Sequence, residues 1–268
     1  MNHIARRNNV RVSGNGDQYM IFANGFGCDQ NVWRHLIPAF QENYKVLLFD
    51  YVGSGQSDMS AYDSMRYKSL HGYALDILEI CEELAIRDAV LVGHSVSCMI
   101  AVKASLLKPE LFSKLIFVAP SPSYINEGEY TGGFEREDLL GLFEVMESNY
   151  LGWSSMVAPL IMGNDNGPEL TEELNNNFCA NDPNIAAEFG IVTFFSDSRA
   201  DLPNVTLPSL TLQCLEDMLA PLEVGDFIHR VTPGNTLKVL KATGHCPHLS
   251  APGETIEVIS SYLMSANE

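Results

Sequence analysis

Short runs of β-branched and aromatic residues alternate along this chain with segments of helical periodicity, and this alternation limits its fold more than any other feature. The runs typical of strands cover 19–23, 45–49, 89–92, 114–118, 209–213 and 236–240. Apolar residues follow helical spacing over 70–84 and again at Ile256, Ile259 and Leu263. A strand followed by a helix, repeated, predicts an α/β fold, with a mainly parallel sheet and helices on both faces.

The alternation stops between residues 121 and 195, where glycines, prolines and amphipathic pieces such as 137–146 and 169–178 replace it. We expect a helical insertion there, so that 1–120 and 196–268 form the core of one domain. If this insertion forms a lid over an apolar pocket, some of its aromatic residues would line that pocket. The others would pack the insertion against the main domain. These aromatic residues are Tyr124, Phe134, Phe143, Tyr150, Trp153, Phe178, Phe189, Phe194 and Phe195.

Composition excludes several classes of function. The 268-residue chain has a formal net charge of −18, which repels phosphate backbones and anionic lipid, so we expect no nucleic-acid partner. A basic protein partner stays open. No stretch of 18 apolar residues is present, which argues against a membrane-spanning role, and the N-terminus lacks a signal-type apolar segment, which favours the cytoplasm. Six scattered cysteines without a Cys-x-x-Cys pair predict reduced thiols, and we expect no metal or cofactor.

A serine stands where a predicted strand meets a predicted helix. The strand 89–92 leads into GHSVS at 93–97, and the segment 98–107 continues as a helix. Such a turn holds a serine in a strained backbone and projects its hydroxyl above the sheet, which predicts Ser95 as a nucleophile. Gly93 fits this motif, whereas Ser97 replaces the usual second glycine. The alternative is that Ser95 only caps the following helix.

A serine nucleophile needs a base that is itself oriented by a carboxylate, and in this topology the chain order is serine, acid, histidine. Asp217 follows the strand 209–213, and His245 follows the strand 236–240. The 28 residues between them (245 minus 217) hold one helix and one strand, as the topology requires. Glu216 and His248 are the neighbouring alternatives to these two.

Backbone donors for a developing oxyanion are predicted in the loop 24–27, which follows the first long strand. Its glycines allow the amide of Phe26 to converge with the amide of Val96, the residue after the nucleophile. The alternative is that Asn24 and Gly25 form only a turn. His94, next to the nucleophile in sequence, is expected to line the pocket.

With these residues in place, the chain resembles a narrow α/β-hydrolase family that comprises the bacterial energy-stress sigma-factor regulator RsbQ and the plant karrikin and strigolactone receptors. The likeness covers nearly the whole chain, and it is carried by GFGCDQ at 25–30, LFDYVGSG at 48–55, GHSVS at 93–97, PELFS at 109–113, GGF at 132–134 and GHCPH at 244–248. We expect the bacterial regulator to be the nearer relative, because this chain is similar to it at 28–30, 50–52, 213–214 and 245–248. At Ser97 the chain is similar to the plant receptors instead.

The resemblance implies a four-helix lid, a small apolar pocket, slow hydrolysis of an ester or enol-ether-like ligand, and stress-response signalling through a protein partner. For the bacterial branch that partner is a phosphatase with a PAS sensor domain. The pocket positions of the family map onto Phe26, His94, Tyr124, Phe134, Leu142, Trp153, Val157, Ile191, Phe194 and Leu219. Asn24 and Val157 depart from the residues of some relatives, which leaves pocket size and ligand open.

Two other functions compete with this interpretation. A metabolic carboxylesterase without a signalling role would carry the same triad. A dinucleotide-binding oxidoreductase is the remote alternative, because Gly25 and Gly27 follow a strand and Asp50 ends the next one. Gln30 stands at the place of the third glycine that such a site needs for close helix packing, which argues against it.

Overall fold

Seven strands form a single sheet in the order β1-β3-β2-β4-β5-β6-β7 in the computed structural model, which describes residues 3–265. Every neighbouring pair is parallel except β1 and β3, which are antiparallel. The predicted α/β class is therefore confirmed. The strands are β1 Arg11–Ser13, β2 Gln18–Ala23, β3 Tyr44–Leu48, β4 Ala89–His94, β5 Phe112–Val118, β6 Ser209–Glu216 and β7 Asn235–Thr243.

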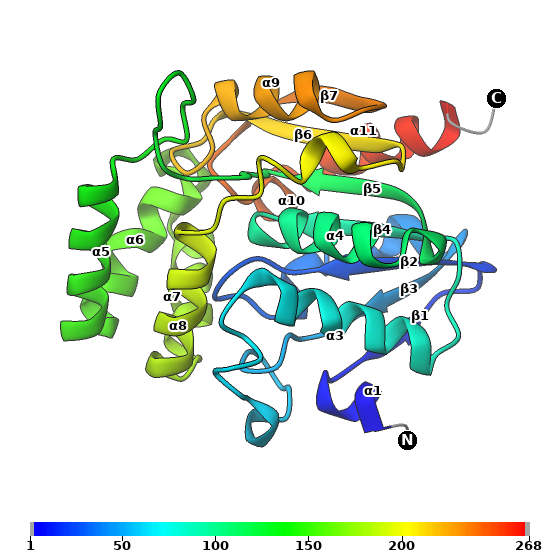
Figure 1. Ribbon diagram of the computed structural model, residues 1–268, viewed down its shortest axis with the longest axis horizontal. Helices are drawn as coiled ribbons and strands as arrows, with labels where there is room; N and C mark the ends of the chain where they lie inside the picture. Colours follow the sequence, from blue (N-terminus) through cyan, green and yellow to red (C-terminus); the bar gives the residue numbers. More distant parts are fainter. Residues whose placement is uncertain (1–2, 266–268) are drawn as a thin grey trace.

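Helices cover both faces of this sheet (Figure 1), with α3, α4 and α9 in front of it and α11 behind. Helix α3 buries the apolar face that its periodicity predicts, including Leu70, Ala74 and Ile77, and the central strand β4 is buried along its whole length. Apart from four helices between β5 and β6, the helices are α1 His3–Arg7, α2 Ile37–Phe40, α3 Leu70–Glu83, α4 Val96–Leu107, α9 Leu222–Val231, α10 Pro247–Ser250 and α11 Pro252–Ser265. Short 3-10 turns lie at η1 Gln30–Trp33, η2 Met59–Ala61, η3 Pro109–Leu111, η4 Asn164–Asn166 and η5 Leu202–Asn204.

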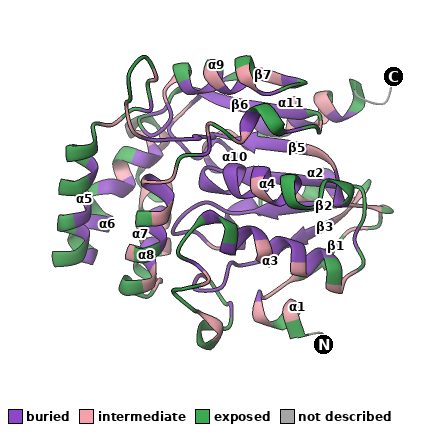
Figure 2. Ribbon diagram, viewed as in Figure 1, coloured by how far each residue is buried: buried purple, intermediate pink, exposed green. Residues whose placement is uncertain are grey.

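Four further helices stand between β5 and β6 in sequence, and we call them the four-helix layer: α5 Arg136–Ser148, α6 Tyr150–Met162, α7 Pro168–Cys179 and α8 Pro183–Phe194. They lie together beside one end of the sheet, at the left of Figure 1. Their outward surfaces are exposed and their inward surfaces are buried (Figure 2). The Phe26 ring of the main domain packs against four aromatic rings of this layer, those of Trp153, Phe178, Phe189 and Phe194.

Asp50 has a structural role in the fold. Its carboxylate accepts hydrogen bonds from the backbone amides of Gln30 and Gln56 and from the side chain of Asn9, and its side chain is buried. Because both carboxylate oxygens are engaged inside the protein, Asp50 does not offer them to a ribose, which argues against the dinucleotide alternative. Within residues 3–265, no helix is long and apolar enough to cross a membrane.

Candidate active site

Ser95 occupies a sharp turn between β4 and α4. Its backbone has φ 56° and ψ −125°, a conformation that is strained for a residue with a side chain. Gly93 makes the turn possible, because a Cβ atom there would lie 2.6 Å from the carbonyl oxygen of Ser97. The serine amide donates to the carbonyl of Val118 at 2.9 Å. The local sequence therefore places the Ser95 side chain at the end of the central strand, as the strand-turn-helix motif predicts.

The structure brings Ser95, His245 and Asp217 together. His245 Nε2 lies 2.7 Å from Ser95 Oγ, and His245 Nδ1 lies 2.7 Å from Asp217 Oδ2. A carboxylate accepts only, so Nδ1 carries the hydrogen and Nε2 of the neutral ring accepts from the serine hydroxyl. All three side chains are buried. This is the geometry in which a histidine can withdraw the proton of a serine nucleophile.

The backbone around the triad fixes the acid and excludes its neighbours. Asp217 Oδ1 accepts from the amides of Leu219 at 2.9 Å and Ala220 at 3.2 Å, which orients the carboxylate toward His245. Glu216 is exposed and takes part through its backbone, where its carbonyl accepts from the Gly244 amide at 2.7 Å. Neither ring nitrogen of His248 has a hydrogen-bond partner among the described residues. The two neighbouring alternatives are thus not in the triad.

The loop that carries Phe26 runs directly past the nucleophile. A Cβ atom on Gly25 would lie 3.3 Å from Ser95 Cβ, so the glycine allows a close approach. Asn24 holds the loop in shape by donating to the Cys28 carbonyl at 2.5 Å. None of the hydrogen bonds formed among residues 3–265 uses the amides of Phe26 or Val96, which leaves both available as oxyanion donors. Their assignment as the oxyanion hole stays a prediction.

A tyrosine adds a third polar group beside the nucleophile. The Tyr124 hydroxyl lies 3.2 Å from Ser95 Oγ, and its ring packs 4.8 Å from the ring of Phe194. Burial raises the pKa of Tyr124, chiefly through desolvation, so the hydroxyl keeps its proton and can donate. Tyr124 therefore lies between the triad and the four-helix layer.

An apolar cavity of about 150 Å³ lies between the main domain and the four-helix layer. No triad residue lines it, but its wall includes Phe26 of the candidate oxyanion loop and Leu219, whose amide donates to Asp217, so the cavity lies next to the loops that hold the triad. Three residues of the wall, Asp138, Leu160 and Met218, are exposed and mark its opening. An engineered apolar cavity of about this size, roughly 150 Å³, binds benzene, which gives the scale of ligand that fits without movement.

Seven of the ten predicted pocket residues line this cavity: Phe26, Phe134, Leu142, Trp153, Val157, Phe194 and Leu219. The structure does not bring His94 and Ile191 into it: the ring of His94 packs against the rings of His245 and His248, and Ile191 on α8 is 44% exposed. Tyr124 is at the nucleophile instead of in the wall.

Sequence reasoning missed Asp138, Leu160, Ile161 and Met218 in the wall. Helical spacing could have found two of them: Asp138 lies four residues before Leu142, and Ile161 four residues after Val157.

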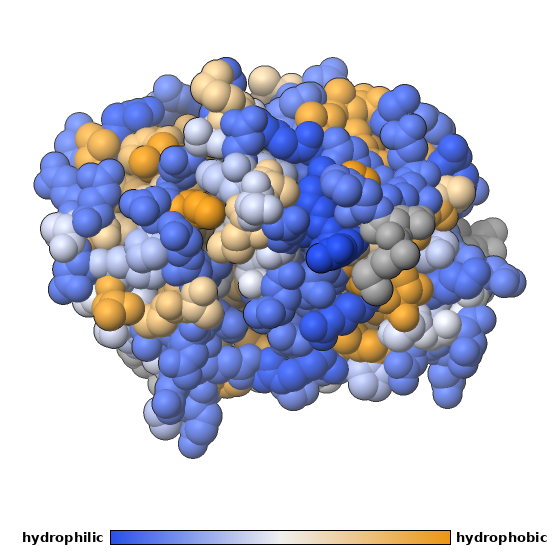
Figure 3. Space-filling view, turned by 90° about the horizontal axis from the view of Figure 1, so that it is seen from below, coloured by the Kyte–Doolittle hydropathy of each residue, from blue (hydrophilic) through white to orange (hydrophobic). Residues whose placement is uncertain are grey.

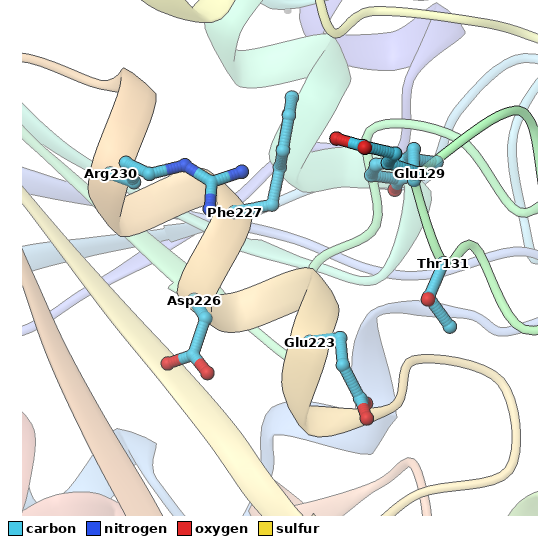
Figure 4. Close-up of a pocket in the computed structure, with 7 residues that line it drawn as sticks. Glu129, Thr131, Glu223, Asp226, Phe227 and Arg230 are labelled. Atoms are coloured by element: carbon cyan, nitrogen blue, oxygen red, sulfur yellow. The ribbon is translucent and has the colours of Figure 1, made fainter.

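A second hollow lies on the outer surface, between α9 and the segment 129–131 (Figure 4). Charged side chains dominate its rim, among them Glu223, Asp226 and Arg230, and, unlike the apolar cavity, its wall contains no residue of the Phe26 loop or the Asp217 loop. It is therefore not the candidate active site. Across the described range 3–265, no group of three or more His, Cys, Asp or Glu side chains is arranged to hold a metal ion.

Comparison with known proteins gives consistent matches over nearly the whole chain. A family model described as "Alpha/beta hydrolase family" matches residues 20–258. Karrikin insensitive 2 receptor CA of Petunia hybrida is 39% identical over 264 residues, covering 98% of each chain. A strigolactone esterase of Arabidopsis thaliana is 38% identical over 252 residues, covering 94% of each. The solved structure of a hydrolase from Oleispira antarctica has a TM-score of 0.96 at 40% identity, covering 98% of this chain and 96% of that one.

Proposed function

Because this chain belongs to the alpha/beta hydrolase family, we propose that it is a serine esterase in which Ser95, His245 and Asp217 are the catalytic triad. The observation that carries the proposal is the pair of 2.7 Å contacts that His245 makes with Ser95 and Asp217 beside an apolar cavity.

The geometry supports acyl transfer through a covalent intermediate. His245 Nε2 takes the hydroxyl proton as Ser95 Oγ attacks the ester carbonyl, and the protonated ring returns that proton to the leaving alcohol. Asp217 stabilises the imidazolium that forms between these steps. The amides of Phe26 and Val96 stabilise the oxyanion, a role in which one lost donor typically costs about 100- to 1,000-fold in kcat. Water, activated by His245, then releases the acid from Ser95.

We propose a small hydrophobic ester or enol-ether-like ligand for this site, with the four-helix layer acting as a lid over it. The support is a cavity wall made mainly of aromatic and aliphatic side chains and a volume of about 150 Å³. At its opening, Asp138 and Leu160 belong to lid helices α5 and α6, and Met218 directly follows Asp217. Because two of these three residues are in the lid, entry of a larger ligand requires the lid to move.

Slow hydrolysis in the service of signalling is the finer proposal, with a metabolic carboxylesterase as the alternative. Relatives at 39% and 38% identity bear the names of a receptor and of an esterase. The lid also exposes apolar side chains that a protein partner could cover: Leu140, Val145, Leu151, Met156, Leu160 and Ile191. Apolar patches lie among hydrophilic ones toward the left of the face in Figure 3. Following the likeness to the bacterial branch, the proposed partner is a cytoplasmic PAS-domain phosphatase of a stress-response pathway.

Turnover of p-nitrophenyl acetate tests the esterase proposal. Ser95→Ala should abolish hydrolysis, whereas Ser105→Ala should retain it, because among the described residues the Ser105 hydroxyl bonds only to the Val102 carbonyl of the same helix, at 2.8 Å. Equal turnover by the wild type and the Ser95→Ala protein would overturn the proposal.

Co-purification with a PAS-domain phosphatase encoded beside the gene tests the signalling proposal. We expect Leu151→Asp in the lid to weaken the complex while leaving ester turnover intact. Absence of any complex, together with fast turnover of simple esters, would favour the metabolic alternative.

A further inference from the structure

His94 connects the nucleophile to the backbone of the candidate base. It is the last residue of β4, directly before Ser95, and its side chain is buried. His94 Nε2 lies 2.8 Å from the backbone carbonyl oxygen of His245. A carbonyl accepts only, so this contact requires a hydrogen on Nε2. One imidazole therefore joins the strand that carries the nucleophile to the loop that carries the base.

The other edge of the His94 ring faces the candidate oxyanion loop. A Cβ atom on Gly25 would lie 2.5 Å from His94 Nδ1 and 3.0 Å from its Cε1 carbon, so the imidazole occupies the space in which Gly25 has no side chain. Among the described residues, Nδ1 has no hydrogen-bond partner. A proton on Nδ1 would thus point at backbone without an acceptor, and burial holds the pKa of His94 well below its ordinary value, with His248 and His245 adding to the effect.

Buried rings pack against one side of the His94 ring. The ring of His248 lies 4.4 Å from that of His94, and the ring of Trp33 lies 4.6 Å from that of His248. Trp33 and His248 are fully buried. Both ring nitrogens of His248 lack partners within residues 3–265, so this residue acts here through packing.

The backbone of His245 is held from two directions. Its amide donates to the carbonyl of Ile161, near the end of lid helix α6, at 2.8 Å. Its carbonyl accepts from His94 of the main domain. The preceding Gly244 has φ 78°, a left-handed turn that glycine permits. The hydrogen bond from His94 is therefore a backbone link from this loop to the strand of the nucleophile, in addition to the contact between the His245 side chain and Ser95.

We propose that His94 is a positioning residue that sets the distance between His245 Nε2 and Ser95 Oγ and keeps the Gly25 loop against the nucleophile. This inference rests on the proposed function, since it concerns the same triad. A misplacement of reacting groups by about 1 Å can cost about 100-fold in rate, so a single link of this kind has a measurable effect.

Three variants test this role through kcat and KM for p-nitrophenyl acetate. His94→Gln places an amide donor near the position of Nε2, His94→Asn places it one carbon short, and His94→Phe fills the space without a donor. We expect kcat to fall about 10- to 100-fold in the Asn and Phe variants with KM changed less than about threefold, and the Gln variant to recover to within about fivefold. The rate of Ser95 labelling by a fluorophosphonate should follow kcat.

Two controls separate this role from general destabilisation and from failure of the proposed function. Ile80→Val truncates a buried residue of α3 and should lower the melting temperature with kcat unchanged. An active Ser95→Ala protein would refute the esterase proposal itself. If Ser95→Ala is inactive while the Asn variant keeps its kcat within about twofold, or while the Gln variant is as slow as the Asn variant, His94 is not a positioning residue.

The wild-type protein offers a test that needs no variant. Nitrogen-15 NMR of the histidine rings at pH 7 should show His94 as the neutral tautomer with its hydrogen on Nε2. The tautomer with its hydrogen on Nδ1 would remove the proposed bond to His245 and overturn the inference, whichever variants fold.

Discussion

The Ser97 hydroxyl donates a hydrogen bond to the Asn24 carbonyl at 2.5 Å and thereby fastens helix α4 to the loop before Phe26. The Tyr51 hydroxyl lies 3.0 Å from the same Ser97 oxygen. Ser97 stands where the nucleophile motif usually has glycine, and its hydroxyl holds the candidate oxyanion loop in place. Both departures at this site, Ser97 and Asn24, thus serve one local structure: Asn24 shapes the loop and Ser97 anchors it.

Removal of this anchor should weaken both stability and catalysis. Ser97→Ala leaves the buried Asn24 carbonyl without its donor, which typically costs about 1–3 kcal/mol of unfolding free energy. We expect kcat to fall with it, because the Phe26 amide becomes less fixed. Urea denaturation and p-nitrophenyl acetate kinetics measure the two effects, with Ser105→Ala as the matched control in the same helix. Equal effects of the two substitutions on stability and kcat would contradict the anchoring role.

The cavity should select short acyl groups. Val157 lines it and is buried, so Val157→Ala enlarges the cavity and Val157→Phe reduces it. Since one methylene in an apolar pocket is worth about 10-fold or more, we expect the octanoate-to-acetate ratio of kcat/KM for p-nitrophenyl esters to rise about tenfold in the Ala variant and to fall in the Phe variant. Met156, the exposed neighbour on α6, provides the control Met156→Ala. An unchanged ratio in both Val157 variants would show that the ligand lies elsewhere.

Thiol reactivity should be confined to one cysteine. Burial raises the pKa of the Cys28 and Cys81 thiols to about 12 and also raises the pKa of Cys98, Cys214 and Cys246. These groups stay protonated and inaccessible at pH 8, whereas Cys179 is exposed. Ellman's reagent should titrate one thiol in the native protein and all six in denaturant. Loss of the native signal in Cys179→Ser would confirm the assignment, and a second fast thiol would contradict it.

Acid should destabilise the fold through the buried histidines. Burial lowers the pKa of His248 from 6.5 to about 3, so the unfolded chain binds a proton there that the folded chain does not. The resulting stabilisation is present above pH 6.5 and declines as pH falls toward 3, by about 1.4 kcal/mol per pH unit for this group. Urea denaturation between pH 4.5 and pH 7 should therefore show a shallower pH slope for His248→Phe. Parallel slopes would exclude this contribution.

The sequence was informative where burial imposes a pattern. Strands β2 to β6 and helix α3 were predicted from their apolar residues, and β7 from its β-branched and aliphatic residues although much of it is exposed; the α/β-hydrolase fold and the likeness to the plant receptors are confirmed. Strand β1 was missed because its three exposed residues pair antiparallel at the sheet edge and carry no alternation. A closer relationship to the bacterial regulator than to the plant receptors stays a prediction.

The site was predictable in order but not in detail. Motif and chain order brought forward Ser95, Asp217 and His245, which the fold then places within hydrogen-bond distance. Neighbourhood in sequence does not bring His94 into the cavity wall, because His94 ends β4 whereas Ser95 lies in the sharp turn that follows it, so a residue next to the nucleophile need not face its pocket. Ile191 on α8 turns toward solvent for a similar reason: a helix presents one side only.

The most direct test is the site of covalent labelling by a fluorophosphonate, mapped by peptide mass spectrometry on the wild type and on His245→Ala. The account predicts a single adduct on Ser95 in the wild type and its loss, or slowing by at least about 1,000-fold, in the variant. An adduct on any other residue, or equal labelling rates in the two proteins, would contradict the claim that His245 activates Ser95.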